Sequence, residues 1–140
     1  MKTELIFFDT YENGLEGTKR GLIAFISLIV LDFMWFSLMK KYYPVTRSTI
    51  NIYSAIFVWL LLCSAIAVQI PKNISEAIVY GLLVGLVIYG IYNFTNLAIL
   101  KEWNIKIATI DTIWGTINCG IAALLIYLIY WKSINNKINQ

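Results

Sequence analysis

Histidine is absent from this chain of 140 residues, and charged residues make up only 14% of it. Without histidine the chain lacks the commonest general base and the usual sensor of physiological pH. Two cysteines alone cannot complete a zinc or haem ligand set. Cys63 and Cys119 both fall in apolar runs, where a free thiol packs as a small apolar residue. We therefore expect no metal or other cofactor.

Motifs of the common enzyme and nucleic-acid-binding classes are also missing. The chain has no nucleophile elbow, no phosphate-binding glycine loop, no dinucleotide fingerprint and no nucleic-acid-binding pattern. These absences argue against an enzyme and against a nucleic-acid partner.

Hydrophobic residues are what the chain has in abundance. They make up 59% of it, and the mean hydropathy is +0.71, whereas a soluble domain carries about 25% charged residues. Four apolar runs reach the roughly 20 residues that a helix needs to cross a membrane, and they span about 21–39, 50–70, 77–100 and 107–131. We predict an all-α polytopic membrane protein, a four-transmembrane-helix bundle whose partner is the lipid bilayer.

The two ends of the chain are polar. We predict an extramembrane tail at 1–20, which lacks the basic start and apolar core of a secretory signal, and a polar C-terminal tail at 132–140. Four crossings put both termini on one side, and the nearly balanced basic residues slightly favour termini outside the cytosol. Abundant Ile, Asn and Lys are typical of AT-rich genomes, including many bacteria and large DNA viruses. The membrane is thus expected to be the cell membrane of a bacterium or the host membrane of a virus.

Four polar residues interrupt the apolar runs at similar depth. At a rise of ~1.5 Å per residue, Asp32 and Asn93 lie ~12 Å inward from the lysines that follow their helices. Asn96 and Asp111 lie ~7–8 Å from theirs by the same rise. All four therefore belong to the same half of the bilayer. An intramembrane acid is a candidate functional site by default, and we predict an intramembrane polar cluster of Asp32, Asn93, Asn96 and Asp111.

Helical periodicity places these residues on faces that meet other helices. A stripe of small and polar residues indicates contact between helices rather than with lipid. The two stripes are Tyr89, Asn93 and Asn96 on the third predicted helix, and Asp111, Gly115, Asn118 and Ala122 on the fourth. Gly81 and Gly85 form a small-xxx-small pair on the third helix, and with Gly115 they are predicted packing residues. We expect the first, third and fourth helices to converge on the polar cluster.

Each of these residues also has a purely structural interpretation. Asp111 is compatible with an interfacial position favoured by the helix dipole. Asp32 costs roughly 2.5–3.5 kcal/mol on insertion scales, which a structural hydrogen bond to Asn93 or Asn96, with the proton retained, would offset. The two asparagines suit interhelical hydrogen bonding better than ligand binding. Three tryptophans have the positions of ordinary interface anchors: Trp35, Trp103 and Trp114.

Three segments resemble a known family. Leu31–Trp35 resembles an LDxxW pattern, Tyr89–Trp103 resembles YGxYxxTNLAxLxxW, and Asp111–Thr116 resembles DxxWGT. These patterns belong to the domain-of-unknown-function 2177 family of small four-helix predicted membrane proteins, and the resemblance extends from about residue 21 to 130. It implies a four-helix membrane domain, found mainly in bacteria, without an assigned activity. The family usually has aspartate where this chain has Asn93, so the resemblance does not support a mechanism that needs three intramembrane acids.

Two functions of different classes fit these observations. The first is a scaffold or accessory role in which the polar cluster holds the helices together. The alternative is a small cation- or proton-coupled transporter or channel that acts through Asp32. At four helices, a transport pathway would require a homodimer.

Overall fold

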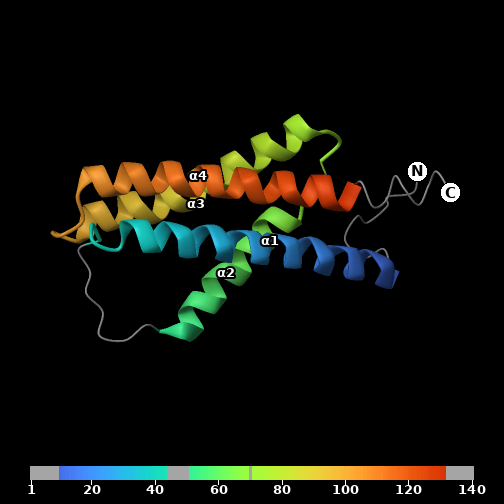
Figure 1. The fold of residues 1–140 in the computed structure, drawn as a ribbon, viewed down its shortest axis with the longest axis horizontal. Helices are drawn as coiled ribbons and strands as arrows, with labels where there is room; N and C mark the ends of the chain where they lie inside the picture. The colour runs from blue at the N-terminus through green and yellow to red at the C-terminus, as the bar shows by residue number, and fades with distance from the viewer. Residues whose placement is uncertain (1–9, 44–50, 70, 132–140) are drawn as a thin grey trace, which may run out of the picture.

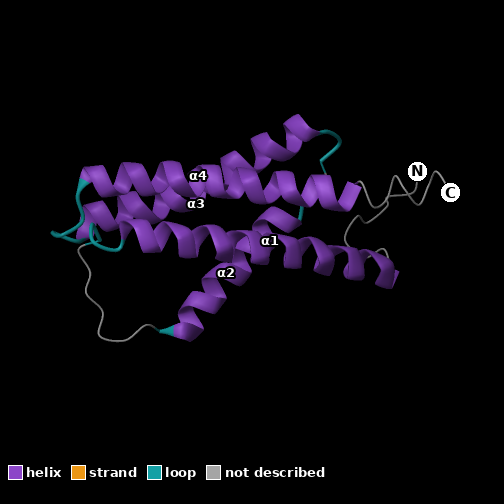
Figure 2. Ribbon diagram, viewed as in Figure 1, coloured by secondary structure: helices purple, strands orange, loops and turns teal. Residues whose placement is uncertain are grey.

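The part of the chain that the structure describes is mostly helical. The computed structural model describes residues 10–43, 51–69 and 71–131, and it contains no strand within them. The helices are α1 (Thr10–Met39), α2 (Ile52–Ala67), α3 (Ile74–Ile99) and α4 (Ile105–Ile126), and α4 continues as the π-helical segment η1 (Tyr127–Trp131) (Figure 2). Three segments are long and apolar enough to cross a membrane, namely Glu16–Met39, Ile74–Ile99 and Ile105–Tyr130. The predicted all-α membrane bundle is confirmed.

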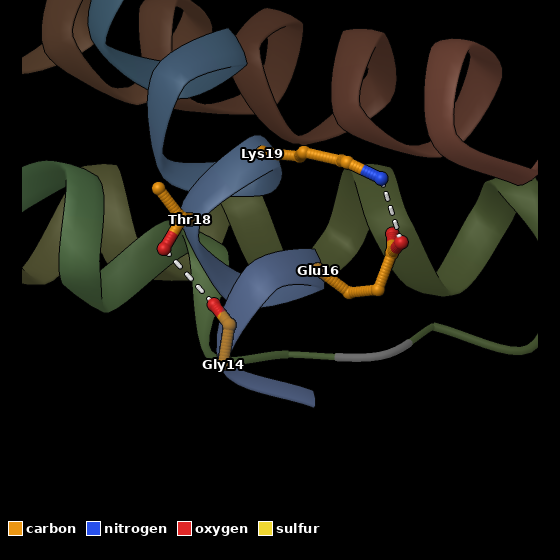
Figure 3. Close-up of polar contacts among 4 residues, drawn as sticks. All are labelled: Gly14, Glu16, Thr18 and Lys19. Carbon is orange, nitrogen blue, oxygen red and sulfur yellow. Dashed lines mark hydrogen bonds and ion pairs between the residues drawn. The ribbon is translucent and has the colours of Figure 1, made fainter. Parts of the chain in front are cut away.

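Helix α1 begins at Thr10, well before the predicted start at residue 21. Local polar contacts support its early turns: Lys19 Nζ pairs with Glu16 Oε1 at 2.8 Å, and the Thr18 hydroxyl donates to the Gly14 carbonyl at 2.9 Å (Figure 3). No proline interrupts this stretch, so the helix continues into the span. Much of the predicted N-terminal tail is thus helical, whereas residues 1–9 and the predicted tail at 132–140 lie outside the described residues.

Helix α2 is shorter than the predicted run at 50–70. Asn51 caps its start, where the Asn51 side chain accepts a hydrogen bond from the Ser54 amide at 3.1 Å. The helix ends before Pro71, which disfavours helical conformation in the residue that precedes it. Its 16 residues extend ~24 Å, less than the ~30 Å of a hydrocarbon core. Three of the four helices are thus long and apolar enough to span by length and composition, and α2 is a shorter apolar helix that runs obliquely across α1 (Figure 1).

Helices α3 and α4 form an antiparallel pair with closely approaching backbones. A Cβ atom added to Gly81 would lie 2.5 Å from the Cys119 carbonyl oxygen. At Gly85 the added atom would lie 2.5 Å from the Gly115 carbonyl oxygen. Gly115 in turn lies directly against the ring of Tyr89. All three glycines that the sequence predicts as packing residues thus lie in the α3–α4 contact.

The apolar core lies where α1, α2 and α4 meet. It consists of Ala24, Leu28, Leu62, Cys63, Ile66, Cys119, Ala122, Ala123 and Ile126. Both cysteines are free and buried. Beyond this core, the C-terminal ends of α1 and α3 and the N-terminal end of α4 share one end of the bundle, at the left of Figure 1. This arrangement brings Asn93 of α3 to Asp111 of α4, and Asp32 of α1 to Asn118, two turns further along α4.

Candidate functional site

Asp111, on α4, is the centre of the first carboxylate cluster. Its side chain is 6% exposed. Asn93 Nδ2, on α3, donates to Asp111 Oδ2 at 2.8 Å. Trp35 Nε1, on α1, donates to Asp111 Oδ1 at 2.9 Å, and the Tyr43 hydroxyl donates to the same oxygen. Asp111 therefore links α4 to α3, to α1 and to the segment that follows α1.

Tyr43 is a member of this cluster that the sequence gives no reason to select. It lies beyond the end of the α1 span, and its ring packs against Trp103 with centroids 5.9 Å apart. Burial, and then its hydrogen bond to Asp111, raise the pKa of the Tyr43 hydroxyl above its ordinary value. The hydroxyl therefore keeps its proton and acts as a donor to the carboxylate.

Asp32, on α1, is the centre of the second carboxylate cluster. It is also 6% exposed. Trp59 Nε1, on α2, donates to Asp32 Oδ2 at 3.0 Å, and Asn118 Nδ2, on α4, donates to Asp32 Oδ1 at 2.8 Å. The indole of Trp114 lies beside the same carboxylate, but its N–H does not complete a hydrogen bond. Asp32 thus connects α1 to both α2 and α4.

The two clusters contain the same kinds of hydrogen-bond donor. Each carboxylate receives one indole N–H and one carboxamide N–H, so all four carboxylate oxygens accept a hydrogen bond. Every donor is neutral, and within the described residues neither carboxylate pairs with a lysine or arginine. The clusters are joined by the parallel stack of Trp35 on Trp114, whose ring centroids are 4.7 Å apart. Within residues 10–43, 51–69 and 71–131, no group of acids and cysteines could hold a metal ion.

Each cluster also contains an amide oxygen without a partner. Asn93 and Asn118 are fully buried, and Oδ1 of each makes no hydrogen bond. A buried acceptor left without a partner costs about 1–3 kcal/mol. The Asn93 amide is oriented by a second bond, from its Nδ2 to the Tyr89 carbonyl at 3.0 Å. Among the described residues, the Asn118 side chain bonds only to Asp32.

The structure separates the four residues of the predicted polar cluster. Asn93 joins Asp111, but Asn96 is only partly buried, and its side chain makes no hydrogen bond in the described part of the chain. The partner expected for Asp32 was Asn93 or Asn96, and this expectation is wrong because the Asp32 side chain faces Asn118 and Trp59. Asn118 shares the stripe of Asp111 and was therefore within reach of sequence reasoning.

The three tryptophans predicted as interface anchors make contacts within the bundle. Trp35 donates to Asp111, and Trp114 stacks on Trp35. Trp103 is 5% exposed and packs against Ile107 and Ala108. All three indoles therefore contribute to packing within the bundle.

The residues of both clusters fall inside one family match. The family described as "Predicted membrane protein (DUF2177)" matches residues 19–128, most of the chain. The chain belongs to this family. Its members are described as predicted membrane proteins, which agrees with the three candidate spans, and we conclude that this is an integral membrane protein. No match to the chain was found among curated proteins or among solved structures.

Proposed function

We propose that this protein is a non-catalytic scaffold or accessory subunit whose two carboxylate clusters hold the membrane helices in one arrangement. The strongest support comes from the hydrogen bonds to Asp32 and Asp111. Each of their four carboxylate oxygens accepts a hydrogen bond from a neutral donor elsewhere in the bundle. Hydrogen bonds between membrane helices typically contribute ~0.6 to 2 kcal/mol each. Five such donors, supplied from several segments of the chain, would give the bundle a specific geometry.

The outer surface of the bundle suits an accessory role. Large apolar side chains remain 55–65% exposed on α2 and α3: Phe57, Leu61, Leu83, Val87 and Ile91. We propose that this surface faces lipid and partner proteins in the bilayer. The membrane would be that of the cell, or that of the host if the source is viral.

Flux measurement tests the proposed role. Purified protein would be reconstituted in vesicles under a proton gradient and, separately, under a sodium or potassium gradient. We expect wild type and Asp32→Asn to give the same flux as protein-free vesicles. Flux in wild type that Asp32→Asn abolishes would reject the scaffold and establish the alternative.

The alternative is cation- or proton-coupled transport through Asp32. It is favoured by one observation: two buried carboxylates share the bundle, and no cationic side chain among the described residues pairs with them. Uncompensated negative charge is expensive in a low-dielectric interior, and a transported cation would neutralise it. Because four helices are few for a pathway, this function requires a homodimer, and a monomeric mass in detergent together with absent flux would exclude it.

A further inference from the structure

We infer that Asp32 is a proton-binding site within the bundle, and that the Asn118 carboxamide turns when the proton binds. This inference goes beyond the scaffold role and does not depend on it. It starts from the surroundings of the Asp32 carboxylate, which is 6% exposed and, among the described residues, accepts hydrogen bonds only from the neutral donors Trp59 and Asn118.

Charge balance points to a proton as the ligand. Among the residues that the structure describes, the titratable groups that face Asp32 are Cys63 on α2, Tyr89 on α3, and Asp111 and Cys119 on α4. None of them carries positive charge in any protonation state. The negative charge of an ionised Asp32 is therefore unbalanced, and binding one proton removes it.

Asn118 is suited to accept that proton's hydrogen bond. It is fully buried. Within the described part of the chain, its Oδ1 has no partner, and its one side-chain hydrogen bond is the 2.8 Å contact from Nδ2 to Asp32 Oδ1. A half-turn of the amide exchanges Oδ1 and Nδ2 and lets the carboxamide accept from a carboxylic O–H. The same residue thus donates to the carboxylate and accepts from the acid, and Trp59 donates to Asp32 Oδ2 in both forms.

The asparagine beside Asp111 cannot turn in the same way. Asn93 Nδ2 donates both to Asp111 Oδ2 and to the Tyr89 carbonyl, so a half-turn would break the bond to the backbone and bring two oxygens together. Trp35 and Tyr43 both donate to the other carboxylate oxygen. The Asp111 side chain is therefore fixed as a hydrogen-bond acceptor, and we assign the exchangeable proton to Asp32.

Infrared spectroscopy of the reconstituted protein tests this assignment. At about pH 6, exposed carboxyl groups with ordinary pKa values near 4 are ionised, so a remaining carboxylic C=O band comes from a buried acid. We expect one such band in wild type, its loss in Asp32→Asn and its retention in Asp111→Asn. The Asp32→Asn variant resembles the protonated acid and can donate to Asn118 Oδ1, so it should fold, which circular dichroism would verify.

Two results would overturn the inference: a wild-type spectrum without the band, or a band that persists in Asp32→Asn. If Asp111→Asn does not fold, Asn118→Ala replaces it, because that variant keeps both acids. The carboxylic band should then remain but change position, since the O–H has lost its acceptor. A band at the wild-type position would show that Asn118 does not receive the proton's hydrogen bond.

Discussion

Asn93 and Asn96 show how much depends on a single residue's position around a helix. The sequence places both on one stripe of α3, and the structure connects only Asn93 to Asp111. At ~100° per residue, three residues turn the side chain by ~300°, so the two amides point about 60° apart. Asn93 faces α4 and is fully buried, whereas Asn96 is turned away and remains partly exposed.

This difference predicts unequal effects of two matched substitutions. Asn93→Ala should destabilise the bundle by ~1–3 kcal/mol, because Asp111 and the Tyr89 carbonyl both lose a donor. Asn96→Ala should change stability by no more than about 0.5 kcal/mol, as is usual for a residue that takes no part in a buried hydrogen-bond network. Denaturant unfolding in mixed micelles, followed by circular dichroism, measures both. Equal losses would show that the hydrogen bonds of Asn93 contribute nothing specific.

The substitution Asn93→Asp should make stability depend on pH. Asn93 Nδ2 lies 2.8 Å from Asp111 Oδ2, and two carboxylates at that distance cannot both ionise. The folded variant must therefore hold one proton that the unfolded chain releases above about pH 4. Its stability relative to wild type should fall as pH rises from there, and the difference between Asn93→Ala and wild type should not fall in this way. Thermal midpoints across a pH series provide the measurement, and a pH-independent difference from wild type would contradict the shared proton.

Among the elements, α3 and α4 are the most tightly joined pair, because glycines allow their backbones to approach. Helix α2 is attached differently, through its short oblique contact with α1 and the bond from Trp59 to Asp32 (Figure 1). The bundle thus combines a close-packed hairpin with a more loosely attached helix. Substitutions at the α3 glycines that contact the α4 backbone should therefore be the most sensitive to added volume.

Gly85 and Gly90 of α3 provide a matched test of this contact. A Cβ at Gly85 would lie 2.5 Å from the Gly115 carbonyl oxygen and 2.7 Å from Thr116 Cα, so the two backbones must separate. We expect Gly85→Ala to cost ~1–3 kcal/mol, as overpacking does. At Gly90 the nearest atom is 3.9 Å away, and alanine should be neutral or stabilising by up to ~1 kcal/mol through helix propensity. Unfolding in micelles measures both, and a tolerated Gly85→Ala would refute the close approach.

For the whole molecule, the sequence predicts depth better than pairing. Hydropathy identifies the helices, and helical rise predicts that the polar residues lie in one half of the bilayer, since both depend only on position along the chain. The choice of Asn118 as the partner of Asp32 depends on how whole helices rotate and pack, which no local pattern encodes. Trp59 and Tyr43 carry no signal at all, because an aromatic residue in or beside an apolar run has the same pattern whether or not its polar atom is used.

The arrangement of the helices also predicts sidedness. Helices α1 and α3 both end at the end of the bundle where α4 begins, and α2 returns the chain between them (Figure 1). Single cysteines in place of the exposed Lys41 and Lys101 should react with a membrane-impermeant thiol reagent from one side, and one in place of Lys72 from the other. We expect the Lys72 side to be outside the cytosol. The native cysteines are buried and should not react with the reagent. Labelling of all three positions from one side would show that α2 does not bring the chain back across the membrane.

The limited reach of α2 has a consequence for the lipids around it. A helix of ~24 Å beside a hydrocarbon layer of ~30 Å leaves about 6 Å of mismatch along one flank of the protein. Because α2 is also oblique, its projection on the membrane normal is shorter still. Lipid tails at this flank must compress or tilt, at a cost of fractions of a kcal/mol per ångström. The protein would therefore carry its own patch of thinned bilayer and would partition toward membranes with shorter acyl chains.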